Sequence, residues 1–90
     1  PPTKRLGWRT TARTKELMGL VASMVLRCDD CITYHVLQAA DQGVTLQEFV
    51  EAFDVAMVVG GSITIPHVRH AQSILAEIES EVVKQRPLRT

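Results

Sequence analysis

The sequence predicts an all-α fold, and three observations support this. Four segments carry apolar residues at the three- and four-residue steps of amphipathic helices. Residues that start or stop helices stand between them, and the only alternation typical of a strand is the short "SITI" at 62–65. With 90 residues, 46% of them hydrophobic, we expect one domain over residues 1–90, with an N-terminal arm at 1–12 and a frayed tail at 85–90.

The first expected helix runs from Lys15 to about Arg27. Its apolar face consists of Leu17, Leu20, Val21, Met24 and Val25. The second expected helix carries residues 31–42. Asp29 and Asp30 are possible acceptors for its N-cap, and Gly43 suits the left-handed residue that closes a helix.

The third expected helix starts at the capping box "TLQE", residues 45–48. The side chains that it should bury are Leu46, Phe49, Val50 and Phe53. The following "VAMVVGG" (55–61) is apolar on every side, which predicts a segment enclosed by protein on all faces, and "GGS" ends the helix.

The fourth expected helix is capped by Ser62 or Thr64 and has Pro66 in its first turn, where the missing N–H costs nothing. Its apolar seam is narrow and should pack against another helix; it comprises Val68, Ala71, Leu75, Ile78 and Val82.

Charge and hydropathy exclude some classes of partner. The ten basic and ten acidic side chains cancel, so no net field would hold nucleic acid or an acidic membrane. No apolar run approaches the ~20 residues that span a bilayer, and the start "PPTKRLGWRTT" lacks the apolar region of a secretory signal. We therefore expect a cytoplasmic protein without nucleic-acid or membrane partners.

The stretch "CDDCITYH" (28–35) holds both cysteines of the chain in the spacing C-x-x-C-x-x-x-H. On a helix, Cys28, Cys31 and His35 fall within an arc of roughly 60°. A helix N-terminus and a nearby imidazole lower a thiol pKa, while carboxylates and burial raise it. Cys31, with His35 one turn further on, should feel the lowering effects most and is the expected nucleophile. Cys28 is the partner able to close a disulfide.

Other readings of this motif stay open. The cysteines could be small hydrophobic residues of the core. Cys28, Cys31 and His35 could also bind zinc with His67 or His70 as a fourth ligand, but structural zinc sites usually pair two short motifs and this chain has one C-x-x-C, so we expect no metal. The favoured interpretation of His67 and His70 is a solvated or interface pair; alternatively, His70 faces the cysteine site or a neighbouring subunit.

A carboxylate that orients the imidazole would complete such a site, and Glu16 is the candidate. Along one straight helix Glu16 would lie ~18 Å from Cys28, too far for a hydrogen bond. It can contribute only if the chain turns back between Arg27 and Asp30. From physics alone, an exposed glutamate in a first helical turn is the favoured interpretation.

The spacing E-x11-C-x2-C-x3-H, followed by "AADQGVTLQEFVEAFDVAMVVGGSITIPHVRHA", resembles the carboxymuconolactone decarboxylase-like superfamily, and within it the alkylhydroperoxidase AhpD-like branch. The resemblance extends from Arg13 to about Leu75. It implies an all-α fold whose subunits associate as trimers or hexamers. It also implies that Cys31 attacks a hydroperoxide, Cys28 resolves the product into a disulfide, and Glu16 and His35 relay protons.

These implications predict a thiol-dependent peroxidase that needs a protein or small-thiol reductant and no cofactor, since no flavin, haem or nucleotide signature is present. The chain holds one copy of the core, so a site completed by a second half would need another subunit. One alternative is a dithiol protein that exchanges disulfides without consuming peroxide. A carboxymuconolactone decarboxylase-type lyase is a weaker one, because no basic residue stands beside the motif to hold a substrate carboxylate.

Overall fold

The structure is a computed structural model that describes residues 9–85. Within them the chain forms α1 (Ala12–Leu26), α2 (Asp29–Asp41), α3 (Leu46–Gly60), a short 3-10 helix η2 (Ser62–Thr64) and α4 (Ile65–Gln85). Residues 9–85 contain no strand, so the predicted all-α fold is confirmed. Of the predicted arm, residues 1–8 lie outside the described residues, as does the tail from residue 86.

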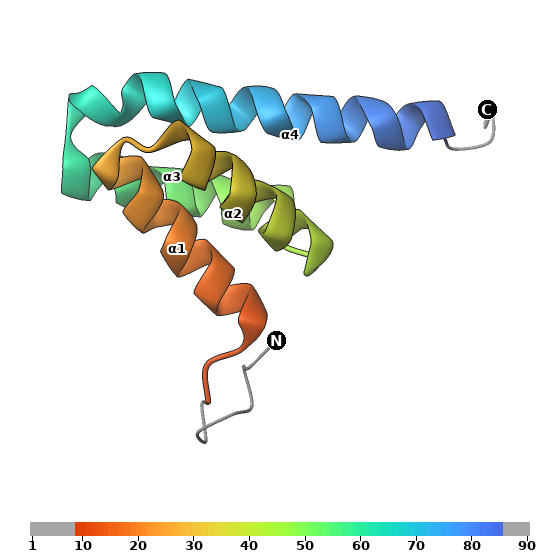
Figure 1. Ribbon diagram of the computed structural model, residues 1–90, viewed down its shortest axis with the longest axis horizontal. Helices are drawn as coiled ribbons and strands as arrows, with labels where there is room; N and C mark the ends of the chain where they lie inside the picture. The colour runs from red at the N-terminus through yellow and green to blue at the C-terminus, as the bar shows by residue number, and fades with distance from the viewer. Residues whose placement is uncertain (1–8, 86–90) are drawn as a thin grey trace.

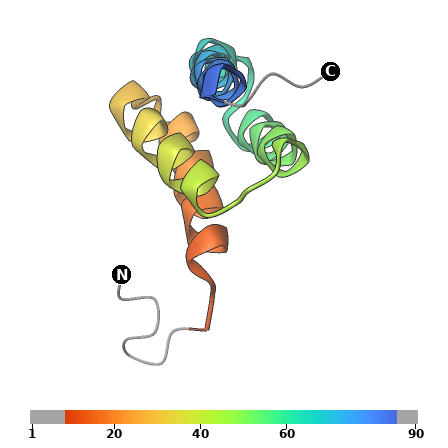
Figure 2. The same cartoon turned by 90° about the vertical axis from the view of Figure 1, so that its right-hand side faces the viewer.

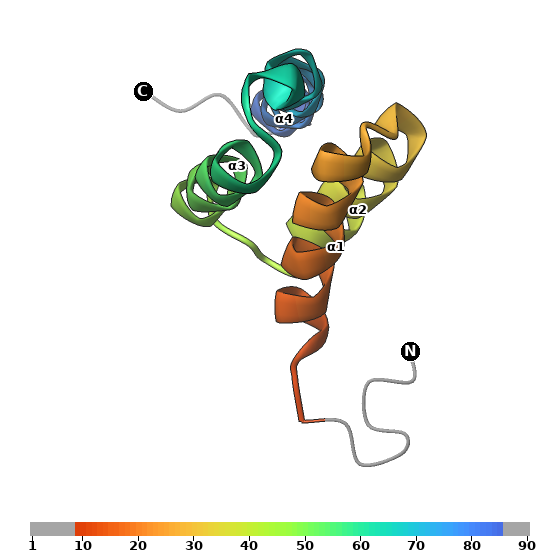
Figure 3. The same cartoon turned by 90° about the vertical axis from the view of Figure 1, so that its left-hand side faces the viewer.

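The helices pack around the α1–α2 pair. α1 packs against both α2 and α3, and α2 packs against α4. α1 and α2 lie side by side and run in roughly opposite directions, and α4 extends well beyond the other helices at its C-terminal end (Figure 1). Seen along α4, the α1–α2 pair and α3 stand on opposite sides, with α4 over the space between them (Figures 2 and 3).

The turn between α1 and α2 brings the second helix back along the first. Arg27 adopts the left-handed conformation (φ 60°), and its amide donates to the carbonyl oxygens of Met24 and Ser23. It is the only non-glycine residue of the described chain with a positive φ. The predicted break after Arg27 is therefore confirmed. At its other end α1 begins at Ala12, three residues before the predicted Lys15.

The start of α2 differs from the prediction. Neither Asp29 nor Asp30 caps the helix. Both already lie in its first turn, where the negative charge of a carboxylate interacts favourably with the helix dipole. Cys28 is the N-cap, with extended backbone (φ −106°, ψ 98°), and its Sγ accepts a hydrogen bond from the Cys31 amide at 3.3 Å. At the other end, Gly43 has a φ of 83° as predicted.

The predicted capping box of α3 is confirmed. The Glu48 amide donates to the Thr45 hydroxyl, and the Thr45 amide donates to the Glu48 carboxylate. Arg13 of α1 forms an ion pair with the same carboxylate. These contacts hold the pKa of the Glu48 carboxyl below its usual value, chiefly through the hydrogen bond from the Thr45 amide. The start of α1 is thereby tied to the start of α3.

The start of α4 is confirmed in one respect and differs in another. Pro66 lies in the first turn, as predicted. The capping role expected of Ser62 or Thr64 is taken over by the 3-10 turn, which runs directly into α4. The Thr64 hydroxyl donates to the Gly61 carbonyl oxygen at 2.7 Å.

The core lies where the four helices face one another. Its buried hydrophobic residues are Leu20, Met24, Ile32, Val36, Ala39, Val44, Phe49, Ala52, Phe53, Ala56, Val68, Ala71 and Ile74. Of the predicted seam of α4, Val68 and Ala71 are buried and Leu75 and Ile78 pack against the core, but Val82 is 46% exposed because α4 has passed its neighbours there.

The prediction that α3 is enclosed on all faces is wrong for the single chain. Val55, Val58 and Val59 are 51%, 84% and 66% exposed. Leu46 and Val50, expected in the core, are 65% and 42% exposed. The reason is geometric: Leu46 and Val50 line an open cleft between α3 and α4. Val55 and Val59 line another between α1 and α3, so the neighbouring helices cover these side chains only in part.

Candidate active site

The two cysteines are joined by a disulfide bond at the start of α2, with their Cα atoms 5.3 Å apart. The N-cap conformation of Cys28 directs its sulfur over the first turn, where Cys31 lies three residues further on. Cys31 is exposed, while Cys28 is half-buried. Cys31 is therefore the more exposed of the two cysteines, at the positive end of the helix dipole.

His35 and Glu16 meet across the α1–α2 pair. His35 Nδ1 lies 2.8 Å from Glu16 Oε1, and the two side chains are 25% and 21% exposed. A carboxylate accepts hydrogen bonds, so the imidazole donates from Nδ1 and its other nitrogen, Nε2, is left as the basic one. Glu16 is thus not the exposed first-turn glutamate that physics alone favoured. The turn at Arg27 brings it to the imidazole.

Gly19 is a residue of this site that sequence reasoning missed. A Cβ atom at Gly19 would lie 2.5 Å from Cε1 of His35 and 2.8 Å from each ring nitrogen. The ring therefore rests against the bare backbone of α1, one turn from Glu16. A glycine inside a helix costs about 1 kcal/mol relative to alanine, and such a glycine indicates close approach by another group. That signal was available in the sequence.

His67 and His70 of α4 both contact α2. His67 Nδ1 lies 2.7 Å from Asp29 Oδ1, and His70 Nε2 lies 2.8 Å from the Thr33 hydroxyl. The hydrogen bond from His67 holds the pKa of the Asp29 carboxyl below its usual value. Neither histidine joins the cysteines as the zinc alternative required, and residues 9–85 contain no group of three or more histidine, cysteine or acidic side chains suited to a metal ion.

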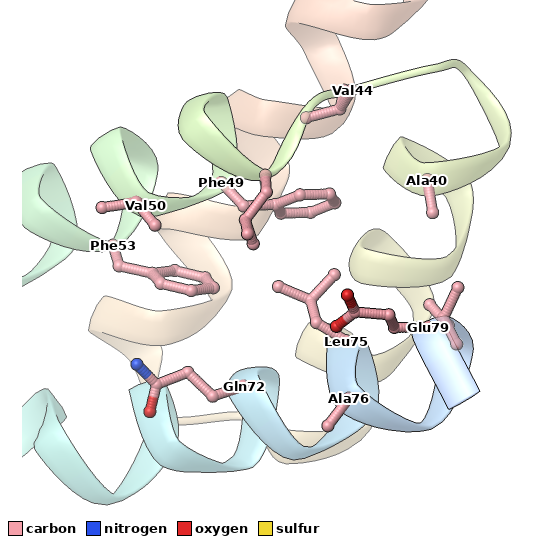
Figure 4. Close-up of a pocket in the computed structure, with 11 residues that line it drawn as sticks. Ala40, Val44, Phe49, Val50, Phe53, Gln72, Leu75, Ala76 and Glu79 are labelled. Atoms are coloured by element: carbon pink, nitrogen blue, oxygen red, sulfur yellow. The ribbon is translucent and has the colours of Figure 1, made fainter. Parts of the chain in front are cut away.

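The larger hollows of the surface lie away from the disulfide. An apolar cleft of about 550 Å³ separates α3 from α4, with Phe49 and Phe53 facing Leu75 (Figure 4). A second, of about 770 Å³, lies between α1 and α3 and is lined by Leu17, Val21 and Val55 among others. Neither is lined by the cysteines, His35 or Glu16. Because Cys31 is exposed, a reagent or a partner can approach the disulfide from the side of that residue.

The arrangement is suited to thiol chemistry. It combines a reducible disulfide, an accessible sulfur in a first helical turn, and an imidazole oriented by a carboxylate one turn further along the helix. An imidazole oriented in this way can take a proton from a thiol, and the resulting thiolate is the reactive form of cysteine.

None of the helices within residues 9–85 combines the length and the apolar character that a membrane span requires.

Comparisons with known proteins agree with this picture. A family model described as "Carboxymuconolactone decarboxylase family" matches residues 6–73. Among curated proteins, "Uncharacterized protein 4 in cox locus" of Paracoccus denitrificans is 33% identical over 67 residues, which cover 74% of this chain and 60% of that protein. The chain thus spans about three fifths of the length of this relative.

Two crystal structures from Thermotoga maritima are similar in fold and sequence. One is of a carboxymuconolactone decarboxylase family protein with a suggested part in the antioxidative response. It matches with a TM-score of 0.78 and 54% identity, over 80% of this chain and 74% of that one. The other matches with a TM-score of 0.78 and 51% identity, over 86% of this chain and 69% of that one.

Proposed function

Because this chain belongs to the carboxymuconolactone decarboxylase family, we propose that it is a thiol-dependent peroxidase of the alkylhydroperoxidase AhpD-like type. The observation that carries the proposal is the hydrogen bond between Glu16 and His35, one helical turn from a cysteine pair that forms a disulfide. The antioxidative role suggested for the relative from Thermotoga maritima supports the same class of reaction.

The first step consumes the hydroperoxide. Nε2 of His35 takes the proton of the Cys31 thiol, while Glu16 accepts the Nδ1–H and stabilises the positive charge that forms on the ring. The thiolate attacks the terminal oxygen of the hydroperoxide and the O–O bond breaks. Cys31 becomes a sulfenic acid, and the leaving alkoxide takes the proton from His35 and departs as an alcohol.

The second step forms the disulfide. The Cys28 thiol attacks the sulfur of the Cys31 sulfenic acid, the S–O bond breaks, and the hydroxyl leaves with the thiol proton as water. The product is the Cys28–Cys31 disulfide of the structure. Two thiols of a reductant then restore the dithiol by exchange and become a disulfide themselves. The exposure of Cys31 gives that reductant a sulfur to attack.

The test is rapid-mixing measurement of organic hydroperoxide consumption by the fully reduced protein, with free thiols counted before and after. We expect two thiols to be lost for each peroxide. Cys31→Ser should abolish the reaction, whereas Cys28→Ser should complete one attack and stop at the sulfenic acid, which a dimedone-type probe labels. Full turnover by the Cys31→Ser variant would refute the assignment of the nucleophile.

A second candidate function, dithiol exchange with a partner protein, is favoured by the accessibility of Cys31 at the surface. It predicts rapid exchange with a disulfide substrate and no loss of thiols in excess peroxide. The same thiol count therefore separates the two candidates. Turnover of a lactone acid by the Cys28→Ser, Cys31→Ser double variant would indicate lyase chemistry instead.

We also propose that the chain assembles with copies of itself. The outer face of α3 exposes Val55, Val58 and Val59, a run of apolar surface that a partner can bury. Formal net charge is zero, so copies are not driven apart by overall repulsion. Sedimentation equilibrium should give a trimer or hexamer, and Val58→Glu should shift it toward monomer. Ser80→Glu serves as the charge control, because it adds the same charge at an exposed position of α4 that lines neither cleft. A monomer at all concentrations would exclude the assembly.

A further inference from the structure

The first turn of α2 carries charge that opposes thiol ionisation. Asp29 follows Cys28 directly and stands two residues before Cys31, and Asp30 lies between Asp29 and Cys31. A carboxylate close to a thiol disfavours the thiolate and so works against the helix dipole and His35. A group that draws the carboxylate away from the cysteines, or that shares its negative charge, would therefore make the thiolate more stable.

The structure contains such a group on α4. His67 donates a hydrogen bond from Nδ1 to Asp29 Oδ1 at 2.7 Å, across a sequence separation of 38 residues. His67 is 19% exposed and Asp29 53% exposed, so the imidazole is the better sequestered partner. The carboxylate is thereby directed toward α4, and its negative charge is shared with a hydrogen-bond donor.

A second contact joins the same two helices without involving a carboxylate. His70 Nε2 lies 2.8 Å from the Thr33 hydroxyl, which itself donates to the Asp29 carbonyl oxygen at 3.0 Å. The hydroxyl has one proton and directs it to that carbonyl, so His70 is the donor. The mechanical link between α2 and α4 thus has two parts, of which only the contact of His67 involves a carboxylate.

We propose that His67 is a positioning residue of the redox pair: by holding the Asp29 carboxylate against α4 and offsetting its charge, it stabilises the reduced dithiol of Cys28 and Cys31. The inference rests on the dithiol chemistry of the proposed function and not on peroxide as the oxidant. The other charged or titratable groups around this turn are Arg27 in the turn itself, Asp30 and His35 on α2, His70 on α4 and Glu16 on α1. They are the same in every variant below.

The direction of the effect follows from charge. Without His67, the Asp29 carboxylate is uncompensated, the thiolate is less stable, and the disulfide gains stability relative to the dithiol. Asp29→Asn removes the charge and has the opposite effect. Exposed groups interact only weakly through solvent, so the expected change in the equilibrium constant is about fivefold. Because a tenfold change is about 30 mV for a two-electron couple, the expected shift is about 20 mV.

The experiment equilibrates the whole chain with buffers of known ratios of reduced to oxidised glutathione and measures the dithiol fraction by alkylation and mass spectrometry. In the balanced reaction, the protein disulfide and two glutathione thiols give the protein dithiol and glutathione disulfide. His67→Ala should favour the disulfide about fivefold, and Asp29→Asn should favour the dithiol. In the Asp29→Asn background, His67→Ala should cause no further shift. The pH dependence of Cys31 alkylation should move upward in His67→Ala.

Thr33→Val is the matched control, because it removes the hydroxyl contacted by His70 and leaves every charge in place. It should leave the equilibrium with glutathione at the wild-type value. Equal shifts in Thr33→Val and His67→Ala would show a purely mechanical role and overturn the proposal, as would an unchanged equilibrium in His67→Ala. If His67→Ala fails to fold, Asp29→Asn decides alone, since a shift toward the disulfide in that variant contradicts the proposed sign.

The experiment also separates this inference from the proposed function. A wild-type pair that does not equilibrate with glutathione would argue against dithiol chemistry altogether. A pair that equilibrates normally but is insensitive to Asp29 and His67 would leave that chemistry intact and remove only the role of His67.

Discussion

Gly19→Ala tests whether the site depends on the close approach of His35 to α1. The added Cβ would lie 2.5 Å from Cε1 of the imidazole, and ordinary contact begins at 3.4 Å. The ring must therefore withdraw by about 0.9 Å, the difference between these two distances. If the ring moves away from Glu16 along the line of their hydrogen bond, the distance between His35 Nδ1 and Glu16 Oε1 grows from 2.8 Å to beyond hydrogen-bonding range. The proton relay is then interrupted while both groups remain in the chain.

The expected effects on stability and reactivity differ. Alanine gains about 1 kcal/mol of helix propensity over glycine, and the overpacked contact costs about 1–3 kcal/mol, so net stability should change by less than about 2 kcal/mol. A misplacement near 1 Å in a catalytic group can reduce a rate by about a hundredfold. We therefore expect a folded protein with a second-order rate constant for hydroperoxide lowered tenfold to a hundredfold.

Two assays on the same preparation decide the matter: denaturant unfolding for stability and rapid mixing with an organic hydroperoxide for rate. Gly60→Ala is the matched control, because its Cβ would meet Thr64 Cγ2 at 2.4 Å, a comparable clash that does not touch His35. It should lose stability and keep the rate of the wild type. A Gly19→Ala protein that reacts at the wild-type rate would refute the reasoning.

Three further predictions concern the relay, the core and the link between α1 and α3. Glu16→Gln keeps an acceptor for His35 without the negative charge, and should slow peroxide consumption at least tenfold while leaving the thermal midpoint within a few degrees; an unchanged rate would contradict a relay. Leu20→Ala, at a position with no exposure, should cost about 2–5 kcal/mol in denaturant unfolding, whereas Leu26→Ala, at 76% exposure, should cost less than about 0.5 kcal/mol. Because its folded-state pKa is lowered, Glu48 adds stability that is complete above the usual glutamate pKa and is lost as pH falls through the lowered value. Melting curves of Glu48→Gln should lack this part of the acid dependence, and identical acid profiles would count against it.

Local sequence patterns predicted most of the fold because they act within one or two turns. The capping box from Thr45 to Glu48, the left-handed Gly43 and Pro66 in the first turn of α4 are all confirmed, and each depends on neighbours in the chain. The cap of α2 was missed because Cys28, a weak acceptor, took the position that the stronger acceptor Asp29 was expected to occupy. Once the chain reverses at Arg27, the geometry of the turn determines the cap.

Burial on α3 was mispredicted for a different reason. Hydrophobicity indicates that Val55, Val58 and Val59 tend to leave water, but it does not identify the surface that covers them. Within the described chain, α1 covers Val55 and Val59 only in part, and Val58 is 84% exposed. The hydrophobic pattern therefore correctly indicated that these side chains tend to be buried, but the prediction wrongly placed the covering surface within the same chain. The proposed self-association would account both for the hydrophobic pattern and for the exposure in the single chain.

The candidate site is predictable to the extent that it lies on one helix. Cys31 and His35 are separated by a single turn of α2, so their spacing is visible in the sequence. Glu16 and Gly19 reach the imidazole only because α1 crosses α2 at that height, and His67 reaches Asp29 only because α4 packs on α2. Glu16 was named from the sequence as the candidate carboxylate, but Gly19 was missed and His67 was not connected with Asp29. Glu16 and His67 contact His35 and Asp29 through hydrogen bonds, and Gly19 leaves room for the imidazole ring. Under our proposals, the tuning of the cysteine pair is therefore a property of helix packing, testable by the variants of α1 and α4 that leave the motif itself unchanged.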